Sequence, residues 1–168
     1  MATIAKQEIE AAVQVHGSNP FTLTLKEAAS QIFVKGELVF LSTAGYVTKI
    51  ASNTPGEIYG VAMGPAHNGT AGQYEVPVCL ATPEQLFRGN VLQSNLTDHT
   101  LAQTDLGSDM AIQADTPNSK VYLNASTIAG ADIRVFTHKQ ARGTSIGDTN
   151  GQVLFNFKPN WIQFLGTS

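Results

Sequence analysis

The sequence predicts an all-β fold, a compact β-barrel or β-sandwich. Short apolar segments alternate with clusters of Gly, Pro, Asn and Ser along most of the 168 residues. Within several of these segments apolar and polar residues alternate, which is the period of a half-buried strand. The clearest helix signal covers only one short segment. Many short strands between turn signals are typical of barrels and sandwiches.

Residues 1–20 are expected to form an extended N-terminal arm, with residues 21–168 as a single β domain. Ile4, Ile9 and Val13 stand near helical spacing, but Gly, Ser, Asn and Pro at 17–20 break the pattern. We expect the arm to be detachable. Deleting residues 2–18 is therefore expected to abolish partner binding while the β fold remains intact.

The next segment leaves two interpretations open. Phe21 and Leu23 alternate with threonines, which favours a strand. Alternatively, Thr24 and Glu27 form a capping box that begins a short helical turn.

Strand signals dominate from residue 32 to residue 80. Residues 38–41 and 46–50 flank a Ser-Thr-Ala-Gly turn and indicate a hairpin. A further apolar segment follows at 58–63, and residues 74–80 alternate again. Pro77 cannot donate a hydrogen bond to a neighbouring strand, so this last segment is expected to lie at a sheet edge or to carry a bulge.

A short helix is expected at about residues 83–88. Thr82 is a good N-cap, Pro83 suits the first helical position and Gln85 completes a capping box, with Gly89 as the stop. The polar stretch 92–109 is expected to be a loop.

Strand signals resume in the last third of the chain. They cover residues 110–114, 120–123, 132–138 and 153–157, and the last of these has a clean period of two. No internal repeat is visible at the periods typical of solenoids.

Composition restricts the classes of function. The formal charge is −3, with 10 Lys and Arg against 13 Asp and Glu, which argues against a nucleic-acid-coating surface. No apolar run is long enough for a membrane span, and the N-terminus lacks the apolar region of a signal peptide. Charged residues make up only 14% of the chain. Such a surface suits a protein packed against neighbours, because interface cores are depleted in charge.

The sequence offers no motif for catalysis, a metal or a cofactor. The four histidines lie in different segments without ligand spacing, and no phosphate-binding glycine motif occurs. Asp98, His99 and Ser94 match a catalytic triad in composition only, without the expected sequence context. The lone Cys79 is expected to be a buried small hydrophobe. We therefore expect no enzymatic activity and no cofactor.

Two stretches resemble the head decoration, or cement, proteins of tailed bacteriophages. The first runs from 21–30 through 35–39, 46–49 and 60–62, and the second covers 147–157. The resemblance implies a β domain of β-tulip type and a structural protein that stabilises the mature capsid. It further implies a homotrimer on the outer surface of the virion, made in the host cytoplasm, that bridges neighbouring major capsid subunits without contacting nucleic acid or membrane.

Only segment-level roles follow from this resemblance, and the individual residues are hypotheses. Contacts to the capsid are assigned to Ile4, Ile9, Val13, Phe21 and Leu23. An interface between copies of the chain is assigned to Trp161, Ile162 and Phe164. The alternative for these last three residues is ordinary core.

Two other functions remain open at this stage. One is another symmetric virion part, such as a tail-tube or fibre-base module. The other is a carbohydrate-binding β-sandwich, which requires its aromatic residues to line one pocket, namely Tyr46, Tyr59, Tyr74 and Trp161.

Overall fold

The fold is all-β, as expected. In this computed structural model the described residues are 1–50, 57–126, 132–138 and 143–163. Within these ranges the helical segments are short 3₁₀ turns: η1 (Ser94–Leu96), η2 (Gln103–Asp105), η3 (Thr116–Asn118) and η4 (Pro159–Trp161). The strands are β1 (Glu10–Gln14), β2 (Thr22–Lys26), β3 (Leu38–Leu41), β4 (Val47–Lys49), β5 (Gly60–Ala62), β6 (Glu75–Leu80), β7 (Gln85–Leu92), β8 (Asp109–Asp115), β9 (Lys120–Asn124), β10 (Ile133–Thr137) and β11 (Gln152–Phe157).

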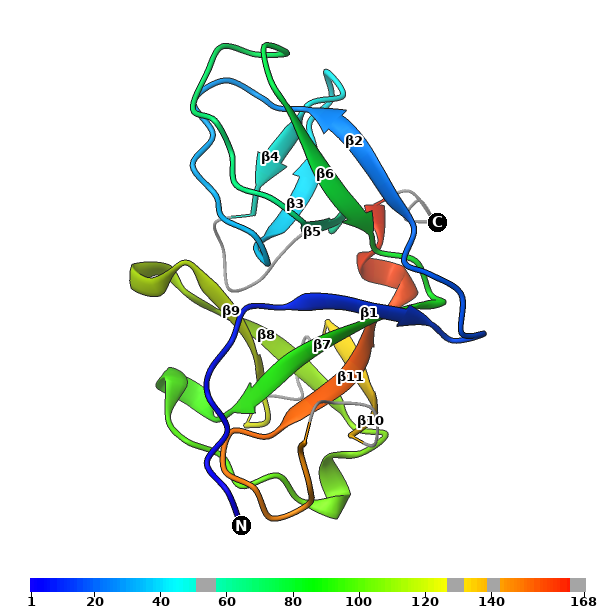
Figure 1. The fold of residues 1–168 in the computed structure, drawn as a ribbon, viewed down its shortest axis with the longest axis vertical. Helices are drawn as coiled ribbons and strands as arrows, with labels where there is room; N and C mark the ends of the chain where they lie inside the picture. Colours follow the sequence, from blue (N-terminus) through cyan, green and yellow to red (C-terminus); the bar gives the residue numbers. More distant parts are fainter. Residues whose placement is uncertain (51–56, 127–131, 139–142, 164–168) are drawn as a thin grey trace.

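The strands form two bodies that follow each other along the long axis of the molecule (Figure 1). We call β2–β6 the first barrel. Its strands are ordered β2-β6-β5-β3-β4, all antiparallel. A parallel bridge between Glu27 and Val47 joins the two end strands and closes the ring.

The second barrel is formed by β7–β11, and β1 is added to its outside. Its order is β7-β11-β10-β8-β9, again antiparallel throughout. A parallel pairing of β9 with β7, in which Val91 lies opposite Leu123, closes this ring of five strands. β1 pairs with the first half of β7.

The two barrels share one topology. In each, the first strand pairs with the fifth, the fifth with the fourth, the fourth with the second and the second with the third. In each, the only parallel contact among the described strands of the ring joins the third strand to the first. The chain therefore contains a structural repeat, with the first barrel inserted between β1 and β7.

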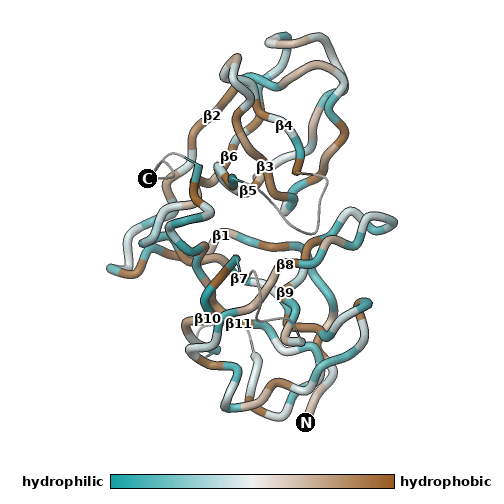
Figure 2. The backbone as a smooth tube through the Cα atoms, turned by 180° about the vertical axis from the view of Figure 1, so that it is seen from behind, coloured by the Kyte–Doolittle hydropathy of each residue, from teal (hydrophilic) through white to brown (hydrophobic). Residues whose placement is uncertain are grey.

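Apolar side chains fill both barrels and the space between them. The rings of Phe87, Phe155 and Phe157 pack inside the second barrel, with centroids 5.1 to 6.0 Å apart. Their cluster also contains Val61 and Cys79 from the first barrel, which has a smaller cluster of its own. In Figure 2 hydrophobic residues alternate with hydrophilic ones along strands of both bodies. The shared cluster joins the barrels into one packed unit.

The N-terminal segment does not stand apart from the body, which corrects the expectation of a detachable arm. The amide nitrogen of Ile4 donates to the oxygen of Thr149 at 2.9 Å, and that of Gln7 donates to Oδ1 of Asn90, also at 2.9 Å. Asn90 in turn donates to the oxygen of Ala5. The segment is extended and lies along the second barrel, where its backbone supplies hydrogen-bond partners for the buried side chain of Asn90.

Ile9 anchors this segment in the core. Only 1% of the side chain is exposed. Its side chain lies at Gly89, between the residues of β7 that pair with β1 and those that pair with β9. Glycine leaves room here, because a Cβ at this position would lie 3.6 Å from Ile9 and 3.1 Å from Phe155.

The helix expected at 83–88 is absent, and the segment forms the start of β7. The capping contact exists, because Oγ1 of Thr82 accepts from the amide nitrogen of Gln85 at 3.0 Å. It closes a turn rather than a helix, since β1 and β11 pair with the residues that follow. Tertiary pairing thus overrides a local signal.

The expectation from Pro77, an edge strand or a bulge, is wrong in both forms, because β6 is not an edge strand and its pairings with β2 and β5 have no register shift. It lies between β2 and β5. Proline is tolerated because Pro77 lies at the end of the ladder between β5 and β6, just beyond the pair of Ala62 with Val78. Its oxygen still accepts from the amide nitrogen of Met63 at 2.8 Å, so the ladder lacks only the bond that an N–H at residue 77 would add.

Candidate interaction surface

The residues assigned to capsid contact lie in different environments. Ile9 is core, and Ile4 and Val13 are half-buried against the second barrel. Phe21 is 51% exposed, and Leu23 is half-buried in β2. Of the five, Phe21 and Leu23 therefore lie together at the surface of the first barrel.

The C-terminal residues connect the two barrels. Ile162 is buried in the shared cluster and Trp161 packs against it. Ile58 donates its amide hydrogen to the oxygen of Trp161 at 2.7 Å, and the Gln163 side chain bonds both the nitrogen and the oxygen of Leu41. Ile162 is thus a core residue, which was the alternative to a place in an interface between copies of the chain. Phe164 lies outside the described residues.

Two histidines form carboxylate pairs. Nδ1 of His67 lies 2.6 Å from Oε1 of Glu27, which is buried, and the His67 ring stacks on Tyr74. Nε2 of His99 lies 2.8 Å from Oδ2 of Asp105, so the partner of His99 is not its neighbour Asp98. Glu27 also closes the first barrel, which makes its pair with His67 part of the barrel seam.

The described residues hold no cluster suited to metal or thiol chemistry. None of their His, Cys, Asp and Glu side chains form a group of three that is placed to bind a metal ion. Cys79 is fully buried, as expected, and burial raises the pKa of its thiol to about 12. A thiol of this kind is inert, because the thiolate is the reactive form.

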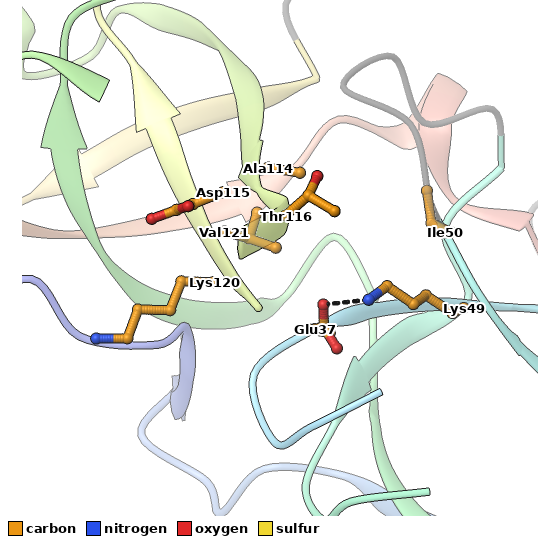
Figure 3. A pocket seen from close by; sticks show the side chains of 8 residues that line it. All are labelled: Glu37, Lys49, Ile50, Ala114, Asp115, Thr116, Lys120 and Val121. Atoms are coloured by element: carbon orange, nitrogen blue, oxygen red, sulfur yellow. Dashed lines mark ion pairs between the residues drawn. The ribbon is translucent and has the colours of Figure 1, made fainter. Parts of the chain in front are cut away.

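A small pocket of about 170 Å³ lies where the barrels meet (Figure 3). Glu37 and Lys49 of the first barrel form an ion pair of 2.7 Å in it. Across the pocket Asp115 accepts from Asn118, and Lys120 donates to the oxygen of Lys6. Its charged groups are thus used in contacts within the chain, and the pocket is best described as a joint between the two barrels.

A second pocket, of about 290 Å³, is mainly apolar and lies on the outer face of the second barrel. It is lined by Val13, Gln14, Val15, Gly17, Leu86, Phe136, Thr137 and Leu154. Phe136 is 54% exposed at its rim.

The aromatic residues that a sugar-binding site requires do not line either of these pockets. Tyr59 packs on the core of the first barrel and Trp161 on the shared cluster. Tyr74 is exposed and stacked on His67.

Two carboxyl groups have pKa values displaced in opposite directions. Burial raises the pKa of Asp132 to about 6, although the amide nitrogen of Ile112 donates to its Oδ2 at 2.9 Å. Hydrogen bonds from Arg134 and Lys158 lower the pKa of Asp109 to about 2. Both groups support the packing of β8, β10 and β11.

The outer edge of β2 is an accessible sheet edge of the first barrel. Its exposed residues Thr22, Thr24 and Lys26 alternate with half-buried Leu23 and Leu25. β2 is the end strand of its sheet: Thr22–Lys26 pair with β6, and the bridge to Val47 of β4 follows at Glu27, just beyond the strand. The edge therefore presents unpaired peptide groups beside partly covered apolar side chains.

Within the described residues no helix has the length and apolar character needed to cross a membrane. Comparison of the chain with protein-family models, with curated proteins and with solved structures finds no match.

Proposed function

We propose that the chain is a structural protein that decorates and cements the mature capsid of a tailed bacteriophage. It acts as a homotrimer on the outer surface of the capsid and ties neighbouring major capsid subunits together, with no bond made or broken. The resemblance of residues 21–30, 35–39, 46–49, 60–62 and 147–157 to head decoration proteins suggests this function. Two packed barrels with a shared core supply the stiffness that cementing requires.

The observation that carries the proposal is the exposure of large apolar side chains on this packed body. Ile32 is 73% exposed, and Phe21 and Phe136 are about half exposed. On a chain with only 14% charged residues, we take these side chains as the candidates for contact with other proteins, because interface cores are depleted in charge. A trimer multiplies several modest contacts of this kind through effective concentration.

The test mixes the purified chain with expanded heads that lack it, and with unexpanded proheads. We expect co-sedimentation with expanded heads at a fixed ratio and a trimeric mass by light scattering. Ile32→Ser and Phe136→Ser form a matched pair from the two barrels. Loss of binding in one of them identifies the face that meets the shell, whereas heads that remain bare with the unchanged chain exclude a decorating role.

A further inference from the structure

The two barrels differ at the outer edge of their first strand. In both, that edge leads to the parallel contact that closes the ring, at Glu27 directly after β2 and at Val91 in β7. Aligning these two residues places Leu23 with Phe87 and Thr24 with Arg88. β1 covers this edge in the second barrel, where Ala11 lies opposite Phe87 and Glu10 opposite Arg88. In the first barrel the described structure places no strand there.

The peptide groups of the β2 edge point in the direction needed for pairing. The oxygen of Phe21 accepts from Leu80 and the nitrogen of Glu27 donates to Tyr74, so alternate residues from Phe21 turn towards β6 and its flanks. In an antiparallel ladder the residues between them turn the other way. The N–H and C=O groups of Thr22 and Thr24 therefore face outwards.

The side chains beside this edge also lack the cover that their counterparts have. Phe87 is completely buried, and Ile9 fills the space at Gly89, the counterpart of Leu25. Leu23 and Leu25 are only half-buried against the core of the first barrel. A strand with an apolar residue at the position of Ile9 completes both the hydrogen bonds and the apolar cover.

We propose that the outer edge of β2 accepts an extended antiparallel strand of the major capsid protein, in the place that β1 occupies on β7. The source of that strand rests on the proposed function. A second copy of the chain is the less suitable donor, because its own strand of this type is already held on β7 by Ile9 and by the hydrogen bonds of Asn90. Main-chain hydrogen bonds supply affinity, and alternate side chains set the register.

The first experiment uses a synthetic peptide with the sequence of residues 7–15 as a probe of the edge. We expect saturating peptide to protect the amides of Thr22 and Thr24 from hydrogen exchange. The amides of Leu23 and Leu25, already within the β2–β6 ladder, serve as the internal control. Exchange at Thr22 and Thr24 that is unchanged by the peptide overturns the acceptor role, and this measurement needs no variant.

The second experiment compares Thr24→Pro with Thr24→Ala. Proline removes the outward N–H and is tolerated at an edge, whereas alanine keeps it. We expect Thr24→Pro to bind the peptide, and expanded heads, about tenfold more weakly than Thr24→Ala. Circular dichroism checks whether both variants fold. If Thr24→Pro does not fold, hydrogen exchange at Thr22 and Thr24 is measured instead on the wild-type chain bound to heads.

The outcomes separate the two proposals. Heads that bind both variants equally, with the edge amides unprotected, exclude the capsid strand but leave the decorating role in place. Heads that bind no form of the chain exclude the decorating role and this source of the strand. The peptide result decides in every case whether the edge accepts a strand.

Discussion

Asp132 and Asp109 show how a single carboxyl group couples the fold to pH. The pKa of Asp132 in the folded protein is about 6, above the ordinary value of 3.8, so folding favours its protonated form. Its contribution to stability is fully present below pH 3.8 and is lost as the pH rises through 6. The pKa of Asp109 is instead lowered to about 2, so its contribution to stability is present above pH 3.8 and is lost as the pH falls through 2.

Asp132→Asn is therefore expected to stabilise the protein at pH 8, by at most about 3 kcal/mol, from a pKa difference of about two units. Near pH 4 the gain should vanish, because the wild-type carboxyl is then neutral in the folded state. Urea unfolding at both pH values measures this. Asp109→Asn is the control of opposite sign: it should destabilise at neutral pH and lose its effect towards pH 2. A gain from Asp132→Asn that is equal at pH 4 and pH 8 contradicts the assignment.

Ile9→Ala is expected to destabilise the fold by about 2 to 4 kcal/mol, because it leaves a cavity beside Phe155 and Gly89. Val15→Ala, at a side chain that is 43% exposed, should change stability by less than about 0.5 kcal/mol. Chemical denaturation of both variants gives the comparison. Equal stability of the two would mean that Ile9 is not part of the core.

At the scale of elements, β1 determines what removal of the N-terminus does. Deleting residues 2–14 uncovers the β7 edge and removes the backbone partners of Asn90. We expect the truncated chain to lose its cooperative thermal transition, which circular dichroism measures, rather than to keep an intact fold without partner binding. A truncated chain with an unchanged melting curve would restore the detachable arm.

Local patterns predicted the elements well where strand alternation is strong, and failed where a short signal has two meanings. Thr82, Pro83 and Gln85 satisfy the rules for a helix start, yet the same cap closes a turn before β7. Gly89 ends no helix, and it is small because Ile9 and Phe155 approach it closely. Such long-range contacts leave no trace in neighbouring residues.

The candidate site was only partly visible in the sequence. Alternation at Phe21 and Leu23 marked β2 as a half-buried strand, and the structure puts both residues at its surface edge. Whether that edge is open depends on which strands pair with β2, and pairing is decided by segments some 50 residues apart, such as Leu23 and Val78. The shared topology of the two barrels was hidden for the same reason.

At the scale of the whole molecule, the shared cluster predicts that both barrels unfold together. Val61 and Cys79 of the first barrel pack in the same cluster as Phe155 of the second. We expect one calorimetric transition whose van't Hoff and calorimetric enthalpies agree. Val61→Ala should lower its midpoint without splitting it. Two resolved transitions in the wild-type chain would show that the barrels are independent.

The insertion of the first barrel between β1 and β7 has a consequence for biosynthesis. β1 leaves the ribosome before its pairing partner β7, and the 70 residues 15–84 lie between the two strands. All strands of the first barrel are synthesised in that interval, while β1 still lacks its partner. Long-range pairing of this type slows folding, so we expect the pairing of β1 with β7 to form late, after the first barrel has been synthesised between them.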